Sequence, residues 1–405
     1  MKKDKAQLLK GFRDFLPDNA LKREWLKEKI SATFQKWGYD PIETPTLEPL
    51  ELFENQIGED EKLFYKFQDL GKRKVVLRYD QTVPACRVVA QYYQQIPMPF
   101  RRYQIQTVFR AEKPQKGRYR EFLQCDADIF GVKSPIADAE VIALSLDIYK
   151  DLGFKNAKVL INDRALLKDI PYKALASIDK FKKIGEAEVL EELQKKGFNS
   201  NDSKKYLAVV MGLEPNSTVQ TILNYLYSYG FDKKQVCFDP TIIRSFSYST
   251  GPIWEVVIEG FEVGSVLGGE RYNNLVKSIL GVEIPGTGFG LGFDRTLEAM
   301  EQFERIPDIK TSTKVLVTVF SKELFELSLK TVKILRERFI NAELYSYEET
   351  KLDKQLKYAD KKQIPYAVIL GPVEAEKNVA VLKNLKTGKQ RSSSLEKIAE
   401  ELSQV

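Results

Sequence analysis

The sequence contains no histidine at all. Histidine is the usual general base near neutral pH and the commonest metal ligand in proteins. Its absence excludes serine–histidine and cysteine–histidine catalytic groups, and it excludes zinc held by imidazole. The chemistry that stays open is that of arginine, lysine, carboxylates and hydroxyls.

Cysteine is scarce, since Cys86, Cys125 and Cys237 are the only ones and stand far apart in the chain. Their number is odd and their spacing is not that of metal ligands, so both a disulfide framework and a zinc site are disfavoured. We expect these cysteines to be small buried residues. We predict no metal ligands in the protein itself.

Long apolar runs are also missing, since none approaches the ~20 residues of a membrane-spanning helix. The N-terminal stretch MKKDKAQLLKGFRD lacks the apolar core and the cleavage site of a signal peptide. A hydrophobic content of 43% with 30% charged residues is typical of a soluble globular protein. We therefore expect a cytoplasmic protein without a membrane partner. Its net charge of +6 agrees with a polyanionic partner.

The order of strand and helix patterns indicates an α+β fold. In residues 21–37, apolar side chains recur at helical spacing. The proline-rich stretch YDPIETPTLEP that follows should be extended. Short strand patterns then recur without a helix between each pair, in KVVLRYD, RRYQIQTVFR, EFLQCDADIF, KVLIND, WEVVIEG and GSVLGG. This order predicts a mainly antiparallel sheet.

The chain of 405 residues is long enough for two or three domains. Residues 165–235 are helix-forming and rich in lysine and glutamate, which predicts an inserted helical subdomain. Periodicity lapses at 303–313, and we expect a domain boundary there. Residues 314–405 alternate as β-α-β-α-β units do, which predicts a compact α/β domain.

Residues 109–128, FRAEKPQKGRYREFLQCDAD, form a basic, turn-rich stretch between two strand patterns. The planar guanidinium of arginine bonds two phosphate oxygens at once. A strand–loop–strand that gathers such side chains suits a protein that grips a polyphosphate without a Walker loop. A solvated basic hairpin is the alternative for this stretch taken alone. The basic residues are Arg110, Lys113, Lys116, Arg118 and Arg120.

Residues 286–295, GTGFGLGFDR, are rich in glycine but do not have the G-x-G-x-x-G spacing of a dinucleotide fingerprint. We interpret them as a strand whose glycines let another backbone or a nucleotide approach closely. A helix should begin near Asp294 and present Arg295. Tight packing between strand and helix is the alternative explanation of the glycines.

Together these stretches resemble the three signature motifs of class II aminoacyl-tRNA synthetases, and most closely those of the histidyl-tRNA synthetase family. The resemblance covers essentially the whole chain. The matching stretches, in order, are GFRDFLPDNA, GYDPIETPTLEP, LRYDQTVP, FRAEKPQKGRYREFLQCDADIFG, RSFSYSTGPIWEV, GGERYNNLV and GTGFGLGFDR. The resemblance implies an antiparallel catalytic sheet flanked by helices in residues 1–310, with the helical insertion at 165–235. It also implies that residues 314–405 bind an anticodon.

The resemblance also implies roles for the arginines. It places Arg110 at the α-phosphate of ATP, Glu112 and Arg118 at the nucleotide, and Arg295 at the γ-phosphate. Arg244 corresponds to the arginine that lies at the α-phosphate during attack. These residues are predicted to bind ATP, and Arg244 and Arg110 are predicted to be catalytic.

A second group corresponds to the amino-acid site of the family. Asp80 and Thr82, with Gln124, match positions that bind the α-amino group. Asp128 matches the carboxylate that faces the imidazole, and Tyr248 matches an aromatic hydroxyl that lines the same pocket. A carboxylate that accepts from a ring N–H suits recognition of histidine, because buried polar groups reject analogues that leave them unpaired. A surface carboxylate beyond the hairpin is the alternative for Asp128.

The resemblance therefore implies a histidine–tRNA ligase. Histidine would be activated with ATP to histidyl-adenylate, with Mg²⁺ at the pyrophosphate, and then transferred to the 3′ end of tRNA(His). The family's architecture implies a homodimer with Pro45 near its two-fold axis. Lysines of 350–362 and 383–391 are candidates for contact with tRNA, although such charge runs also occur as solvated faces.

The chain departs from the family pattern in two places. Where the family has L-D-Y-Y, this chain has Phe246-Ser247-Tyr248-Ser249, which removes one aspartate and one tyrosine near the imidazole. Ser249 keeps a hydroxyl with less reach. Ala111 and Leu123 replace histidines that members of the family often carry.

Two other functions are compatible with parts of the sequence. One is a non-catalytic paralogue that senses histidine or tRNA, or regulates histidine biosynthesis. Such paralogues tend to lose motif arginines or the C-terminal domain, and this chain keeps both. The other is a general nucleic-acid-binding module, which would gather its basic residues among stacking aromatics. Here the basic residues are spread along the chain, so we favour the enzyme.

Overall fold

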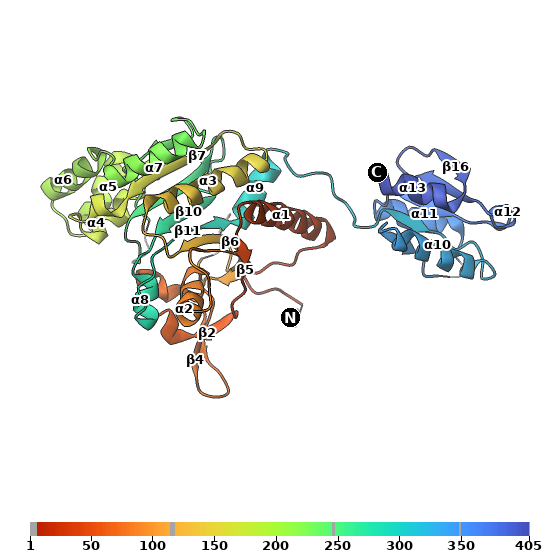
Figure 1. Ribbon diagram of the computed structural model, residues 1–405, viewed down its shortest axis with the longest axis horizontal. Helices are drawn as coiled ribbons and strands as arrows, with labels where there is room; N and C mark the ends of the chain where they lie inside the picture. The colour runs from red at the N-terminus through yellow and green to blue at the C-terminus, as the bar shows by residue number, and fades with distance from the viewer. Residues whose placement is uncertain (1–5, 114–117, 245–247, 348–349, 405) are drawn as a thin grey trace, which may run out of the picture. The chain divides into compact units, whose positions relative to one another are not determined.

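The structure is a computed structural model that describes residues 6–113, 118–244, 248–347 and 350–404 (Figure 1). Lys116 of the basic hairpin, as well as Phe246 and Ser247, lie outside the described residues. The chain divides into two compact units. One comprises Met1–Arg13 with Leu26–Arg305, and the other comprises Asp14–Trp25 with Ile306–Val405.

In its described residues, the first unit is centred on an eight-stranded sheet with the order β1-β5-β6-β11-β10-β9-β7-β8. All neighbours from β5 to β7 pair antiparallel, whereas β1 and β8 pair parallel at the two edges. The strands are β1 (Asp40–Pro41), β5 (Phe100–Phe109), β6 (Glu121–Phe130), β7 (Ala157–Asp163), β8 (Val236–Phe238), β9 (Pro252–Ile258), β10 (Leu267–Arg271) and β11 (Gly286–Gly292).

Two local predictions about this sheet are confirmed. The basic stretch connects β5 to β6, which pair antiparallel from Phe100 opposite Phe130 to Phe109 opposite Glu121. The glycine-rich stretch forms β11 and runs directly into helix α9 (Phe293–Gln302), close to the predicted helix start.

Helices cover one face of the large sheet (Figure 1). The helix α3 (Pro135–Asp151) packs on β6, β7 and β11, and α9 packs on β6 and β11. The first turn of α3 is well specified, because Ser134 caps it and Pro135 occupies the first helical position. The helix α1 (Pro17–Lys36) buries Leu26, Ile30 and Phe34, as its predicted apolar stripe requires.

A smaller sheet, in the order β2-β4-β3, lies beside the start of α2 (Thr82–Tyr92). Its strands are β2 (Leu47–Pro49), β3 (Lys66–Gln68) and β4 (Lys74–Leu77). Apolar side chains of α2 and of α8 (Leu275–Leu280) share one core with this sheet. Short 3-10 helices occur at Leu50–Leu52, Gly58–Leu63 and Arg164–Leu167.

The segment predicted as a helical insertion is helical. It contains α4 (Tyr172–Ile178), α5 (Phe181–Lys195), α6 (Ser200–Met211) and α7 (Ser217–Ser228). Asn199 and Asn216 cap α6 and α7 through their side chains, which satisfies backbone N–H groups of the first turns. Leucine, isoleucine and valine side chains from α4, α5 and α6 pack in one core with Ile242, Ile243 and Ile253, the last of which is on β9.

The second unit contains a five-stranded sheet, counted over its described residues, in the order β13-β12-β14-β15-β16. The pairs of β12 with β13 and β14 are parallel, and the pairs of β15 with β14 and β16 are antiparallel. The sequence predicts the parallel part, and the β15–β16 hairpin extends it. The elements are β12 (Val315–Val317), α10 (Phe325–Glu337), β13 (Ala342–Leu344), α11 (Leu352–Lys361), β14 (Tyr366–Ile369), α12 (Pro372–Glu376), β15 (Ala380–Asn384), β16 (Gln390–Ser393) and α13 (Leu395–Gln404).

The predicted fold class is confirmed: an antiparallel-rich sheet flanked by helices, a helical insertion and a C-terminal α/β part. The exact domain boundaries at 310 and 314 stay predictions. In the ranges that the structure describes, no helix is both long enough and apolar enough to span a membrane.

A buried ion pair fastens α3 to the large sheet. The guanidinium of Arg271, at the end of β10, donates to both carboxylate oxygens of Asp138, with Nε–Oδ1 and Nη2–Oδ2 distances of 2.9 and 2.7 Å. Thr287 of β11 also donates to Asp138, over 2.7 Å. Arg271 further donates to the main-chain carbonyls of Val132 and Ser134. This one guanidinium therefore fixes where α3 begins relative to β10 and β11.

Arg271→Leu should lower the free energy of unfolding by about 3–5 kcal/mol, because it leaves the Asp138 carboxylate buried without its counter-ion. Urea unfolding followed by circular dichroism measures this change. The double variant Arg271→Leu, Asp138→Leu should recover part of the loss, since neither charge remains. Unchanged stability of the single variant would contradict a structural role for the pair.

Candidate active site

The face of the large sheet opposite α3 is polar, and strand register explains why. Gln124, Asp126 and Asp128 alternate along β6 and so share one face. On β11, Gly288 stands opposite Asp128 and Gly290 stands opposite Asp126. A side chain at Gly288 would overlap the Asp128 carboxylate, and one at Gly290 would overlap the Gln124 amide. The β11 glycines therefore give the β6 side chains room to lie across the sheet, as the close-approach interpretation requires.

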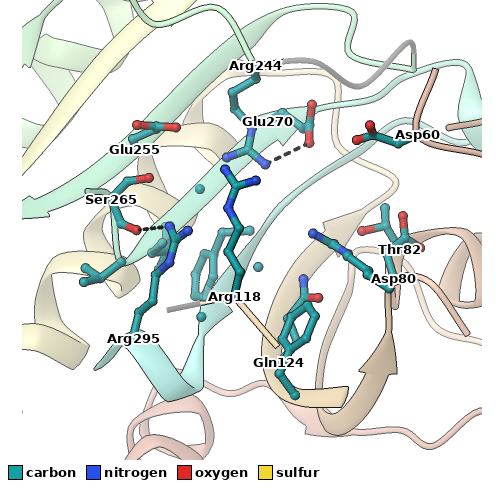
Figure 2. Close-up of a pocket in the computed structure, with 18 of the residues that line it drawn as sticks. Asp60, Asp80, Thr82, Arg118, Gln124, Arg244, Glu255, Ser265, Glu270 and Arg295 are labelled. Atoms are coloured by element: carbon teal, nitrogen blue, oxygen red, sulfur yellow. Dashed lines mark hydrogen bonds and ion pairs between the residues drawn. The ribbon is translucent and has the colours of Figure 1, made fainter. Parts of the chain in front are cut away.

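Above this face lies a cavity of about 870 Å³ (Figure 2). Side chains from the β5–β6 hairpin, β10, β11, the start of α2 and the segment before β9 all reach it. The cavity lining includes every residue that the sequence singles out for ATP or for the amino acid: Asp80, Thr82, Arg110, Glu112, Arg118, Gln124, Asp128, Arg244, Tyr248 and Arg295.

One end of the cavity is cationic. Figure 2 shows the guanidinium groups of Arg118, Arg244 and Arg295 converging from different elements. Arg295 donates to the carbonyl of Ser265 over 2.9 Å, and Arg118 contacts Glu112 at 3.4 Å. Burial and the nearby Arg118 lower the pKa of Arg295. A polyanion bound here would relieve this repulsion between cations.

Arg110 is held at the base of the hairpin. Its Nε donates to the Tyr79 carbonyl over 3.3 Å. Its guanidinium carbon lies 4.5 Å from the centre of the Tyr79 ring and 5.3 Å from that of Phe122. The aromatic rings fix the direction of the side chain, and cation–π attraction adds to this. Arg110 therefore enters the cavity in a defined orientation.

Arg244 reaches the centre of the cavity from a strained backbone. Its φ is 48°, in the left-handed region that a residue with a side chain rarely adopts. A side chain at Gly268 would overlap the guanidinium, so the glycine makes room for it. Burial opposes the charge, but Glu270, at 3.4 Å, and Glu255 raise the pKa of Arg244 above its ordinary value. Arg244 is therefore a charged and fixed cation.

The other end of the cavity is acidic. Asp80 is buried and accepts a hydrogen bond from the Val83 backbone N–H at 3.1 Å. Burial, only partly opposed by this bond and by Arg110, raises the pKa of Asp80 to about 6. Nearby, the side chains of Tyr248 and Thr82 are hydrogen-bonded to each other. An ammonium group placed beside Asp80 would stabilise the ionised form of this carboxyl, which burial disfavours.

Asp128 is clamped from two sides. The Tyr272 hydroxyl donates to its Oδ1, and the Arg102 guanidinium forms an ion pair with its Oδ2. Asp128 is only 2% exposed and Arg102 is fully buried. The alternative of a surface carboxylate is therefore wrong for Asp128.

Three residues that line the cavity or lie beneath it were not predicted from the sequence. Glu270 accepts a hydrogen bond from Ser249, and it also pairs with Arg244. Glu270 and Tyr272 stand in the GGERYNNLV stretch, whose two charged residues next to paired glycines were the available signal. Arg102 gives only a weak signal, because it stands next to Arg101 in the sequence and the pattern does not show which of the two is buried. None of the three could be placed without the strand register.

A metal ion fits this cavity only as a partner of a bound anion. No group of three or more cysteine, aspartate or glutamate side chains that could hold a metal exists within the described ranges. Glu112 and Glu255 line the cationic end of the cavity. They could each supply one oxygen to an ion whose remaining ligands come from phosphate groups.

The antiparallel sheet, with arginines and carboxylates gathered over a glycine-lined face, agrees with the class II aminoacyl-tRNA synthetases that the motifs of the sequence resemble. Comparison with known sequences identifies the family. Residues 11–204 and 182–296 match the family described as histidyl-tRNA synthetase, and residues 314–405 match the anticodon binding domain family.

Known relatives agree. A protein of Cytophaga hutchinsonii named histidine–tRNA ligase is 34% identical, over 98% of this chain and 100% of its own length. A ligase of the same name from Aeropyrum pernix is 35% identical over 91% of each chain. The crystal structure of histidyl-tRNA synthetase from Nostoc superposes with a TM-score of 0.84 at 28% identity, covering 99% of this chain and 100% of that one. The chain belongs to the histidyl-tRNA synthetase family, as its motifs predict.

The buried Asp80 carboxylate should lower the free energy of unfolding at pH values where it is ionised. Its pKa of about 6 exceeds its ordinary value of 3.8, so its effect on stability is most favourable below pH 4 and is lost as the pH rises through 6. Asp80→Asn should therefore raise the free energy of unfolding at pH 8 by about 2–3 kcal/mol. Urea unfolding at pH 8 and pH 4 tests this, and the gain should vanish at pH 4. Equal stability of the two proteins at pH 8 would contradict it.

Proposed function

We propose that the protein activates histidine with ATP and transfers the histidyl group to the 3′ end of tRNA(His). The family match and the relatives named histidine–tRNA ligase bear out an aminoacyl-tRNA synthetase rather than the non-catalytic paralogue. The observation that carries the proposal for the site is the gathering of every predicted ATP and amino-acid residue around one cavity. Their individual roles are part of the proposal.

The arginines suit the first step. The carboxylate of histidine attacks the α-phosphorus of ATP, and pyrophosphate leaves, so the main obstacle is the approach of two negative groups. Arg110 and Arg244 would neutralise the α-phosphate, while Arg118 and Arg295 would hold the rest of the nucleotide. Such fixed charges in a water-poor cavity stabilise developing charge strongly. No protein base is needed, which agrees with a sequence that contains no histidine.

Mg²⁺ would be held by phosphate oxygens with help from Glu112 or Glu255, and when bound it neutralises the departing pyrophosphate. Glu112 would then act both on the ion and as a partner of Arg118. The charge of Arg118 and Arg295 remains available to the phosphates when the ion is present.

The residues at the acidic end of the cavity would position histidine for the reaction. Asp80 would bind the α-ammonium with Thr82 and Gln124, and Asp128 would accept a hydrogen bond from the imidazole. Tyr248, packed edge-on against Tyr272 at 6.0 Å between ring centres, would close the pocket around the ring. Ser249 does not reach this pocket directly, since its hydroxyl donates to Glu270.

The proposal also covers the oligomeric state of the enzyme, its contact with tRNA and its location in the cell. A homodimer formed through the proline-rich segment, with Pro45 near the axis, agrees with the family's architecture. Residues 314–405 would bind the anticodon, and the reaction would take place in the cytoplasm. Contacts between basic side chains and tRNA phosphates weaken as salt is added, so the affinity for tRNA should fall steeply with ionic strength.

Exchange of radioactive pyrophosphate into ATP, measured with each of the twenty amino acids, tests the activity. Histidine alone should support exchange. Exchange with another amino acid would show that the serines at Ser247 and Ser249 have changed the specificity of the pocket. Absence of exchange with all twenty would favour the non-catalytic paralogue.

Arg244→Ala should abolish histidine-dependent exchange while the protein stays folded, since the guanidinium would act on the α-phosphate during attack. A loss of about 100-fold or more in kcat is expected for a fixed charge at the reacting group. Arg305→Ala, at the end of the first unit and away from the cavity lining, is the matched control. Near-normal exchange by Arg244→Ala would reject this role.

A further inference from the structure

Arg102 lies beneath the amino-acid end of the cavity and is fully buried. On β5 it stands directly opposite Asp128 of β6, so the two side chains share one face of the sheet. Its Nη2 pairs with Asp128 Oδ2, and its Nη1 donates to Gln104 Oε1 over 2.7 Å. Arg102 does not line the cavity, so it acts on a bound amino acid only through Asp128.

The Arg102 side chain is itself held by a chain of amides. Gln104 donates to Gln106 over 2.7 Å, and Gln106 accepts from the buried Arg78 at 3.3 Å. Arg78 in turn donates to the carbonyl of Thr44 over 2.8 Å. Each link is buried or partly buried, so the guanidinium of Arg102 has little freedom to turn away from Asp128.

The charges around Asp128 leave Arg102 as its main counter-ion. Burial raises the pKa of Asp128, and Arg102 and the Tyr272 hydroxyl counter that rise. Burial also raises the pKa of Asp126 well above its usual range, which disfavours a charge on this second carboxyl. Glu270 is paired with Arg244. The titratable and charged groups that act on Asp128 or on its partner are Tyr39, Asp80, Cys86, Arg102, Asp126, Glu270 and Tyr272.

An Arg102–Asp128 pair has no net charge, and this decides what it can bind. A neutral imidazole can donate its N–H to Asp128 without bringing a charge into the buried site. An imidazolium would add a second cation close to Arg102, and its desolvation would go uncompensated. Without Arg102, the same carboxylate would instead favour the imidazolium as its counter-ion.

We propose that Arg102 is a positioning residue that sets the form of histidine the site accepts: by neutralising Asp128, it makes this carboxylate an acceptor for neutral imidazole and not a counter-ion for imidazolium. This inference rests on the proposed function and deepens it. It assigns a role in specificity to a residue that never touches the substrate.

The test is the dissociation constant of histidine, measured by isothermal titration calorimetry between pH 7.0 and 8.5. In this range the ring of free histidine is mostly neutral and Asp80, with its pKa of about 6, is mostly ionised. The wild-type constant should be nearly flat. For Arg102→Met it should rise with pH by up to about tenfold per unit wherever Asp128 is ionised in the free variant, because the complex then carries one more proton than the separate site and neutral ligand.

Three control variants isolate the charge of Arg102. Arg102→Lys keeps a cation and should keep the flat profile. Arg102→Met combined with Asp128→Asn removes both charges and should be flat again at weaker affinity. Asp126→Asn removes any charge from the neighbouring carboxyl and should leave the profile unchanged.

Two results would overturn this inference and leave the proposed function intact. One is an equally flat profile in Arg102→Met at unchanged affinity, which would reduce Arg102 to a structural role. The other is a wild-type constant that falls tenfold between pH 8.5 and 7.0, which would show uptake of imidazolium and needs no variant to fold. Failure of the wild type to bind histidine at any pH in this range would instead reject the proposed function together with this inference.

Discussion

The pairing of β11 with β6 is the constraint on which the rest of the site depends. Glycines on β11 face Asp128, Asp126 and Gln124 on β6, and a side chain at either Gly288 or Gly290 would displace the groups opposite. Because β11 has glycines at these positions, β6 can project two carboxylates and an amide over the sheet. The cavity, its acidic end and the space for a nucleotide all follow from this arrangement.

Charge is distributed along the cavity in a way that suits a reaction without histidine. Arg118, Arg244 and Arg295 gather at one end beside Glu112 and Glu255, Asp80 lies at the other end, and Arg244 contacts Glu270. Positioned guanidinium groups can stabilise a phosphoryl transition state without accepting a proton. The absence of imidazole therefore leaves the proposed chemistry intact.

The departure at Ser249 also has a structural consequence. A serine hydroxyl is too short to reach a ligand in the cavity, and it instead donates to Glu270. Glu270 lines the cavity and holds Arg244, so the shorter side chain acts through a carboxylate that does reach the site. Two residues outside the cavity lining therefore contact residues of the lining: Ser249 contacts Glu270, and Arg102 contacts Asp128.

The sequence by itself determined the α+β class, the basic hairpin, the glycine strand that leads into a helix, and the residues that meet at the cavity. These features depend on local periodicity and on motifs whose spacing is specific. The tertiary structure alone decided which side chains pair: Arg102 with Asp128, Glu270 with Arg244, and Arg271 with Asp138. Register, burial and the left-handed backbone of Arg244 set these pairs, and each pair joins two separate segments of the chain.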